Sequence, residues 1–132
     1  MARPGSKHPT ELELEILKVL WDTSPLPVRE VRLRLEAQAG RALSHSSVIT
    51  MLNIMVRKGY LRREKQGKAC FFAPQVDRES VAGGIMGDLV SRVFGGSPSA
   101  MVLNLIENAD LDADEIKELR RLISRKAKGQ QK

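Results

Sequence analysis

The stretch from Ser44 to Pro74, SHSSVITMLNIMVRKGYLRREKQGKACFFAP, predicts a helix with two unlike faces followed by a β-hairpin. Its apolar side chains recur at intervals of three and four residues, which places them on one helix face: Val48, Met51, Leu52 and Met55. We expect the helix to stop near Lys58, because Gly59 suits its C-terminal end. Residues 61–66 and 68–73 then follow a two-residue rhythm, with a turn around Gln66 and Gly67.

The opposite face of this predicted helix carries Ser46, Thr50, Asn53 and Arg57. Such short polar and cationic side chains reach the base edges and phosphates of nucleic acids. We predict base contacts from Ser46, Thr50 and Asn53, with Ser47 and Ile49 at the flanks. The helix end and the hairpin add cations against one acid, Glu64, and these cations are predicted to bind phosphates: Arg57, Lys58, Arg62, Arg63, Lys65 and Lys68.

Two shorter helices are predicted before this stretch. Residues 1–9 show no hydrophobic periodicity and are expected to be a flexible tail. Thr10 and Glu13 are expected to form a capping box at the start of a helix over 11–21. A second helix over 28–38 is expected to have Pro27 at its first position, and Ser44 or Ser46 caps the third. Three helices followed by a cationic hairpin predict a winged helix-turn-helix domain over residues 10–76.

Residues 77–126 predict three further helices, at about 77–94, 98–108 and 112–126, with a flexible tail at 127–132. Gly83, Gly84 and Gly87 weaken the first of them, so it needs a partner surface. The apolar stripes exceed what about 50 residues bury alone, which favours a homodimer. The alternative is that these helices fold back on the first domain. The predicted interface residues are Val81, Ile85, Leu89, Val93, Phe94, Val102, Leu105, Ile116, Leu119 and Ile123. The expected fold is therefore mainly α with a small β-hairpin.

The charge is distributed unevenly along the chain. Residues 1–76 hold 13 Lys and Arg against 7 Asp and Glu, whereas residues 77–132 hold 9 of each. The whole excess of +6 thus lies in the half with the two-faced helix, which favours a polyanionic partner. No apolar run reaches the roughly 20 residues of a membrane span, and the N-terminus lacks a signal-peptide core. The expected location is the cytoplasm, without membrane insertion.

Other chemistry finds little support. The serines around His45 are explained by helix capping, and no acid is placed to orient that histidine. Cys70 is the only cysteine, and we interpret it as a partly covered strand residue. Because His8 lies in the expected tail, a His/Cys metal site is not expected. We expect no enzymatic activity, no cofactor and no metal.

The chain resembles the penicillinase-repressor (BlaI/MecI/CopY) family of winged-helix regulators from about Thr10 to Lys126. In the second region the resemblance rests on Phe94, Gly95, Gly96 and Ser97 with the residues that follow them. In the first region it rests on Val28, Glu30, Val31, Leu35, Ser47, Val48, Thr50, Leu52, Met55, Lys58, Gly59, Phe72 and Pro74.

This resemblance implies a dimeric repressor on a palindromic double-stranded DNA operator. It also implies inactivation by a membrane-embedded sensor metalloprotease, with the scissile bond between Asn104 and Leu105. The family commonly has phenylalanine where Leu105 stands, and arginine where Ile54 stands. The Cys-x-Cys motifs of the copper-responsive branch are absent from this sequence.

Two other function classes compete with this interpretation. A protein-interaction adapter would use a winged helix without DNA, but its hairpin would lack cations or pair them with acids. A ligand-sensing regulator would need a pocket between domains, and nothing in the sequence marks one.

Overall fold

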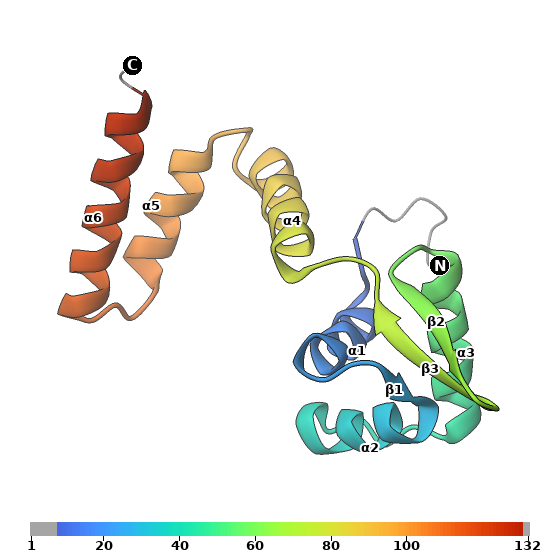
Figure 1. Ribbon diagram of the computed structural model, residues 1–132. Coiled ribbons are helices and arrows are strands. Elements are labelled where there is room, and N and C mark those ends of the chain that lie inside the picture. Colours follow the sequence, from blue (N-terminus) through green and yellow to red (C-terminus); the bar gives the residue numbers. More distant parts are fainter. Residues whose placement is uncertain (1–7, 131–132) are drawn as a thin grey trace. The chain divides into compact units, whose positions relative to one another are not determined.

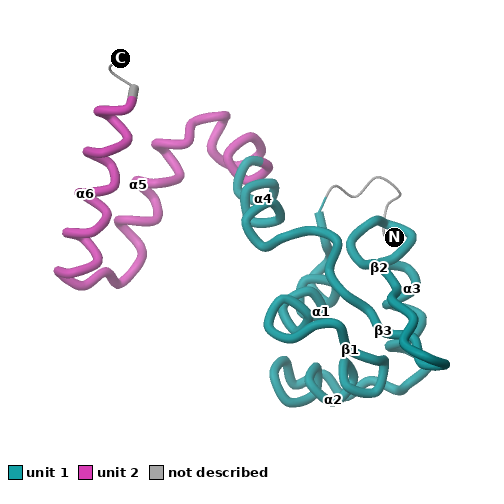
Figure 2. Tube along the Cα trace, in the orientation of Figure 1, with its two compact units in different colours: residues 1–87 teal, residues 88–132 magenta. Residues whose placement is uncertain are grey.

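The computed structural model describes residues 8–130, which form two compact units divided at Gly87 and Asp88 (Figure 2). Most of the expected tails, residues 1–7 and 131–132, lies outside the described residues. The elements follow one another along the chain as labelled in Figure 1: α1 (Glu11–Asp22), β1 (Leu26–Pro27), α2 (Val28–Ala39), α3 (His45–Arg57), β2 (Leu61–Gln66), β3 (Ala69–Pro74), α4 (Arg78–Val93), α5 (Pro98–Asn108) and α6 (Ala113–Gln130).

The first unit is a winged helix built on one hydrophobic core. The stripe predicted for α3 is confirmed, since Val48, Leu52 and Met55 are fully buried and Met51 is half-buried. These side chains meet apolar residues of the other two helices and the sheet: Ile16, Leu17, Val19, Leu20, Leu26, Val31, Leu35, Leu61 and Phe72. Burying one face of α3 in this way leaves its polar face exposed.

Hydrogen bonds from side chains fix where the helices begin. The Thr10–Glu13 capping box of α1 is present as predicted, and the α3 cap is Ser44, whose hydroxyl accepts from Ser47 N at 3.1 Å. Ser97 Oγ accepts from Ala100 N at the start of α5. Asp77 caps α4 by accepting from Ser80 N at 2.7 Å, and this bond lowers the pKa of Asp77 below its usual value.

The sheet has three strands in the order β1-β3-β2, not only the two of the predicted hairpin. Pro27 pairs with Phe71 in β1, and its extended backbone makes it the residue before α2, so its predicted place at the first helical position was wrong. A proline fits this edge strand because it has no N–H to offer a further partner. The hairpin turn lies at Gly67 and Lys68, one residue later than predicted, with Gly67 at a φ of +63°.

The junction after the winged helix continues into the start of α4. Trp21 Nε1 donates to Val76 O at 2.9 Å, and the guanidinium of Arg78 lies 5.4 Å from the centre of the Trp21 ring. Trp21 is half-buried and therefore borders the core rather than filling its centre. These contacts explain why the first unit extends to Gly87, beyond the boundary predicted at residues 76 and 77.

The second unit has no buried side chain among residues 88–129. Its helix α6 reaches Gln130, past the predicted end at Lys126. A groove of about 230 Å³ between α5 and α6 is lined mainly by apolar residues: Ile106, Leu111, Ile116, Leu119, Arg120 and Ile123. Helices of this kind gain stability mainly by packing, so this unit lacks the interior that a stable isolated domain needs.

Candidate nucleic-acid interface

The N-terminal half of α3 presents a cluster of hydroxyl groups on an open surface. Ser46, Ser47 and Thr50 are exposed and line, with Met51, a shallow depression of about 320 Å³. Ser44 Oγ lies 2.9 Å from Ser47 Oγ and 3.3 Å from Ser46 Oγ. The capping residue thus also contacts two of the predicted base-reading hydroxyls, a role that was not predicted for it.

Asn53 connects α3 to the hairpin. Arg63 Nη2, on β2, donates to Asn53 Oδ1 at 2.7 Å, so the predicted base reader and a predicted phosphate contact are partners of one another. Asn53 and Ile49 are both half-buried, less exposed than Ser46 and Thr50. A charge-assisted hydrogen bond of this length orients the asparagine amide. The hairpin and α3 therefore form one continuous polar surface.

The six predicted phosphate-binding cations differ in what they contact. Arg62 pairs with Glu64 at 2.9 Å and also donates to Pro74 O. Within residues 8–130 no carboxylate lies within ion-pairing distance of Arg57, Lys65 or Lys68, and all three side chains are exposed. These three cations are the ones most available to an anionic partner.

Lys58 is held by a carboxylate inside the first unit. Its Nζ lies 2.8 Å from Oε2 of Glu13, a residue only 1% exposed. A phosphate contact by Lys58 would require it to leave this buried carboxylate without a partner, which is costly. Tyr60 lies nearby, and its pKa is raised above 10 by burial and by the negative charge of Glu13. The geometry thus gives Lys58 a structural role.

Glu13 was not predicted to be buried or paired with a cation, although the sequence carries a signal for it. Glu13 precedes Ile16, Leu17 and Leu20 at three-and-four spacing, so it belongs to the buried face of α1. An acid on such a face needs a cationic partner from elsewhere in the fold. The capping box accounts for only one of its two oxygens, because Oε1 accepts from Thr10 N and Oε2 remains for Lys58.

The predicted interface residues fall into two groups. Large exposed apolar side chains occur at seven of these positions: Leu89, Val93, Val102, Leu105, Ile116, Leu119 and Ile123. Phe94 is half-buried. Val81 and Ile85 are also half-buried, and they belong to the first unit, where they lie beside α1. The second unit therefore holds most of the apolar surface that a partner could cover.

The bond between Asn104 and Leu105 lies inside α5. Both residues are exposed, with Leu105 at 62%, and Asn104 O accepts a hydrogen bond from Asn108 Nδ2 at 2.8 Å. The backbone on both sides of this bond is helical. A protease that cleaves extended chain would have to open this part of α5.

Comparisons with known proteins agree with the features described above. The family model described as "Penicillinase repressor" matches residues 9–125. The chain belongs to the penicillinase repressor family. The match runs from the capping box of α1 into the second half of α6, so it covers both units.

Individual relatives have low sequence identity to this chain, but the alignments cover most of both chains. The chain is 30% identical over 114 residues to the penicillinase repressor of Bacillus licheniformis, which covers 86% of this chain and 88% of that protein. It is 25% identical to the methicillin resistance regulatory protein MecI of Mammaliicoccus sciuri, over 86% of this chain and 91% of that protein. A solved structure described as the complex structure of hsRosR-S4 matches with a TM-score of 0.53 and 18% identity, over 93% of each chain, which supports the fold alone.

Proposed function

We propose that this protein is a dimeric, sequence-specific DNA-binding repressor. The observation that carries the proposal is the continuous surface formed by the polar face of α3 and the cationic hairpin, joined by the Arg63–Asn53 hydrogen bond. A helix with this exposed face fits the major groove, and the hairpin then lies along the phosphates. Membership of the penicillinase repressor family supports this function.

The contacts are divided between two tasks. Ser46, Ser47 and Thr50, with Ile49 at the flank, read base edges together with Asn53. The phosphates are bound by Arg57, Lys65 and Lys68, with Arg62 and Arg63 at the side of the hairpin. Lys58 is left out of this set because its ammonium is paired with Glu13. One helix and one hairpin make few base contacts, so a single copy binds weakly.

Dimerisation through the second unit supplies the second copy of α3 and its hairpin. Its exposed apolar residues have no interior of their own, and a second copy of the chain would cover them. A symmetric dimer presents two copies of α3 related by a two-fold axis, which matches a palindromic operator.

Relief of repression is proposed to follow proteolysis by a membrane-embedded sensor metalloprotease. Cleavage between Asn104 and Leu105 would separate α6 and the end of α5 from the rest of the chain. Several of the proposed interface residues lie in that fragment, so the dimer would weaken. We place the protein itself in the cytoplasm, where it reaches DNA. Within the described part of the chain, no single helix is long and apolar enough to span a membrane. The two helices α4 and α5 together have that length and composition, but they are bent by 96° relative to one another.

A mobility-shift titration across a salt series tests the proposal. The probe is the DNA upstream of the protein's own gene, and the control is random DNA of equal length. We expect a site preference of at least about a thousandfold and a steep loss of affinity with salt. An adapter that does not use DNA would show no preference between the two probes, and that result would refute the proposed function.

A further inference from the structure

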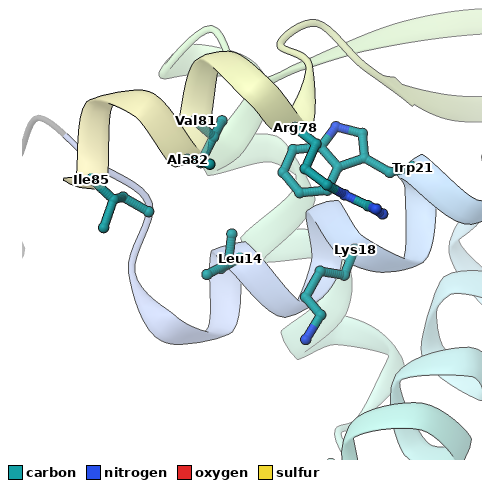
Figure 3. Close-up of a pocket in the computed structure, with 7 residues that line it drawn as sticks. All are labelled: Leu14, Lys18, Trp21, Arg78, Val81, Ala82 and Ile85. Carbon is teal, nitrogen blue, oxygen red and sulfur yellow. The ribbon is translucent and has the colours of Figure 1, made fainter. Parts of the chain in front are cut away.

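A depression in the first unit lies between α1 and the start of α4, away from the face of α3. Its volume is about 380 Å³, within the range of roughly 300–1,000 Å³ that is usual for small-molecule sites. Its lining is mainly apolar and all of it comes from residues of the first unit: Leu14, Lys18, Trp21, Arg78, Val81, Ala82 and Ile85. Figure 3 shows Trp21 and Arg78 at one end of the depression and Ile85 at the other.

The polar groups at this depression are both cations. Within the described part of the chain, neither Lys18 nor Arg78 has a carboxylate within ion-pairing distance. The guanidinium of Arg78 stacks 5.4 Å from the centre of the Trp21 ring, and the hydrogen bond from Trp21 Nε1 to Val76 O fixes that ring. The depression therefore combines a rigid aromatic wall with positive charge that no acid neutralises.

The geometry points to a binding site for a small organic acid with a bulky apolar body. Its carboxylate would lie between Lys18 and Arg78, and its apolar part would cover Leu14, Val81 and Ile85. A carboxylate matches a guanidinium with two parallel hydrogen bonds, and the apolar part gains by leaving water. This site does not depend on the proposed contacts to DNA.

A second copy of the chain is the competing occupant, because Val81 and Ile85 were expected at a dimer interface. An apolar partner surface would remove Lys18 and Arg78 from water without giving them a counter-charge. Burial of unpaired charges is strongly unfavourable, so the two cations favour the organic acid.

The full-length protein can be tested with para-tert-butylbenzoate as the probe. Trp21 is the only tryptophan in the chain, so its fluorescence reports on this depression alone. We expect a saturable change in emission, confirmed by calorimetry, and affinity for the neutral amide of the probe lower by about tenfold or more. The substitution Ala82→Phe fills the depression and should abolish binding.

Charge variants give the matched comparison. Lys18→Met and Arg78→Met should each weaken binding of the acid by about tenfold, whereas Arg29→Met, which removes an exposed cation of α2 outside the depression, should leave it unchanged. Equal binding of acid and amide, or equal loss in all three variants, would overturn the assignment. So would Trp21 emission that varies with protein concentration and ignores the acid, since a second copy would then fill the depression.

Discussion

The ammonium of Lys58 lies 2.8 Å from the carboxylate of Glu13, so the residue that closes α3 is bound to the first turn of α1. The other oxygen of the same carboxylate accepts from Thr10 N at 2.9 Å. One buried acid thus fixes both the start of α1 and the end of α3. The pair therefore helps, together with the buried stripe of α3, to hold the candidate reading helix in the first unit.

Removing Lys58 should destabilise the protein measurably. Lys58→Met leaves the buried Glu13 carboxylate without its cation, and we expect the free energy of unfolding to fall by roughly 1–3 kcal/mol, allowing for the partial exposure of the lysine. Denaturant unfolding measures this loss. Lys65→Met is the control, because Lys65 is exposed and unpaired within the described residues. The double variant Glu13→Gln with Lys58→Met should recover part of the loss, and strict additivity of the single effects would show that the pair is not coupled.

Tyr60 provides a spectroscopic test of the same region. Burial and the charge of Glu13 raise its pKa above the usual value of 10.0, so the neutral form is favoured in the folded state. This contribution to stability is complete below pH 10 and is lost as the pH rises through the folded pKa. Tyr60 is the only tyrosine, so ultraviolet absorbance should show a higher titration midpoint in the folded than in the denatured protein.

The substitution Glu13→Gln should lower the folded midpoint of Tyr60, because it removes a negative charge that opposes ionisation of the phenol. A matched substitution of the exposed acid Glu36 should leave the midpoint where it is. Identical midpoints in folded and denatured wild-type protein would contradict the burial described for this tyrosine.

Substitutions of Asn53 and of Lys68 should change DNA binding in different ways. Asn53→Ala removes a proposed base contact, which should cost about 1–3 kcal/mol on the operator and relax the base preference. Lys68→Ala should instead weaken binding to all sequences alike and lower the slope of affinity against salt by about one unit. Salt titrations on operator and random DNA measure both effects. If the two variants behaved alike on both probes, the proposed division of contacts would be wrong.

The apolar surface of the second unit should govern assembly. Leu105 and Ile123 are 62% and 57% exposed, and a charge at either position should shift the full-length protein from dimer to monomer in sedimentation experiments. Leu33 is also exposed, at 44%, but it lies on α2 in the first unit, so Leu33→Asp serves as the control. A wild-type protein that stays monomeric at micromolar concentration would remove the basis of the proposed dimer.

Cleavage in α5 should depend on the residue after Asn104. When the protein is incubated with membranes that carry a sensor metalloprotease of this regulatory type, we expect fragments ending at Asn104 and beginning at Leu105. Leu105→Phe should be cleaved faster, because it restores the residue that is common in the family. Mass spectrometry identifies the ends of the fragments. Cutting at another bond, or an intact chain with both variants, would count against the proposed scissile bond.

Periodicity and capping chemistry were sufficient to predict most of the fold. The buried stripe of α3 and the hairpin follow from local spacing, and the caps at Thr10 and Ser44 follow from short-range hydrogen bonds. The strand at Pro27 could not be predicted, because its partner Phe71 lies far along the sequence. Local pattern does not encode such pairings.

The helix face that carries the candidate residues could be predicted from spacing, but the partners of those residues could not. Ser46 and Thr50 are exposed and Asn53 is half-buried, and all three lie off the buried stripe of α3, as the spacing requires. Counting cations could not separate Lys58, which pairs with Glu13, from Lys68, which is unpaired within the described residues. The depression beside Trp21 was also missed, since it arises where α1 and α4 meet in three dimensions.

The hydrogen bond between Arg63 and Asn53 engages the amide oxygen that the proposed base contact would use. In the proposed complex, a base that donates to Asn53 Oδ1 would share or compete for this oxygen with Arg63. In that complex, a sequence without a suitable base would leave the Arg63–Asn53 bond in place, so binding to random DNA would not require its loss. In this proposal, part of the preference for the operator comes from the Arg63–Asn53 hydrogen bond, because only a suitable base compensates for its loss.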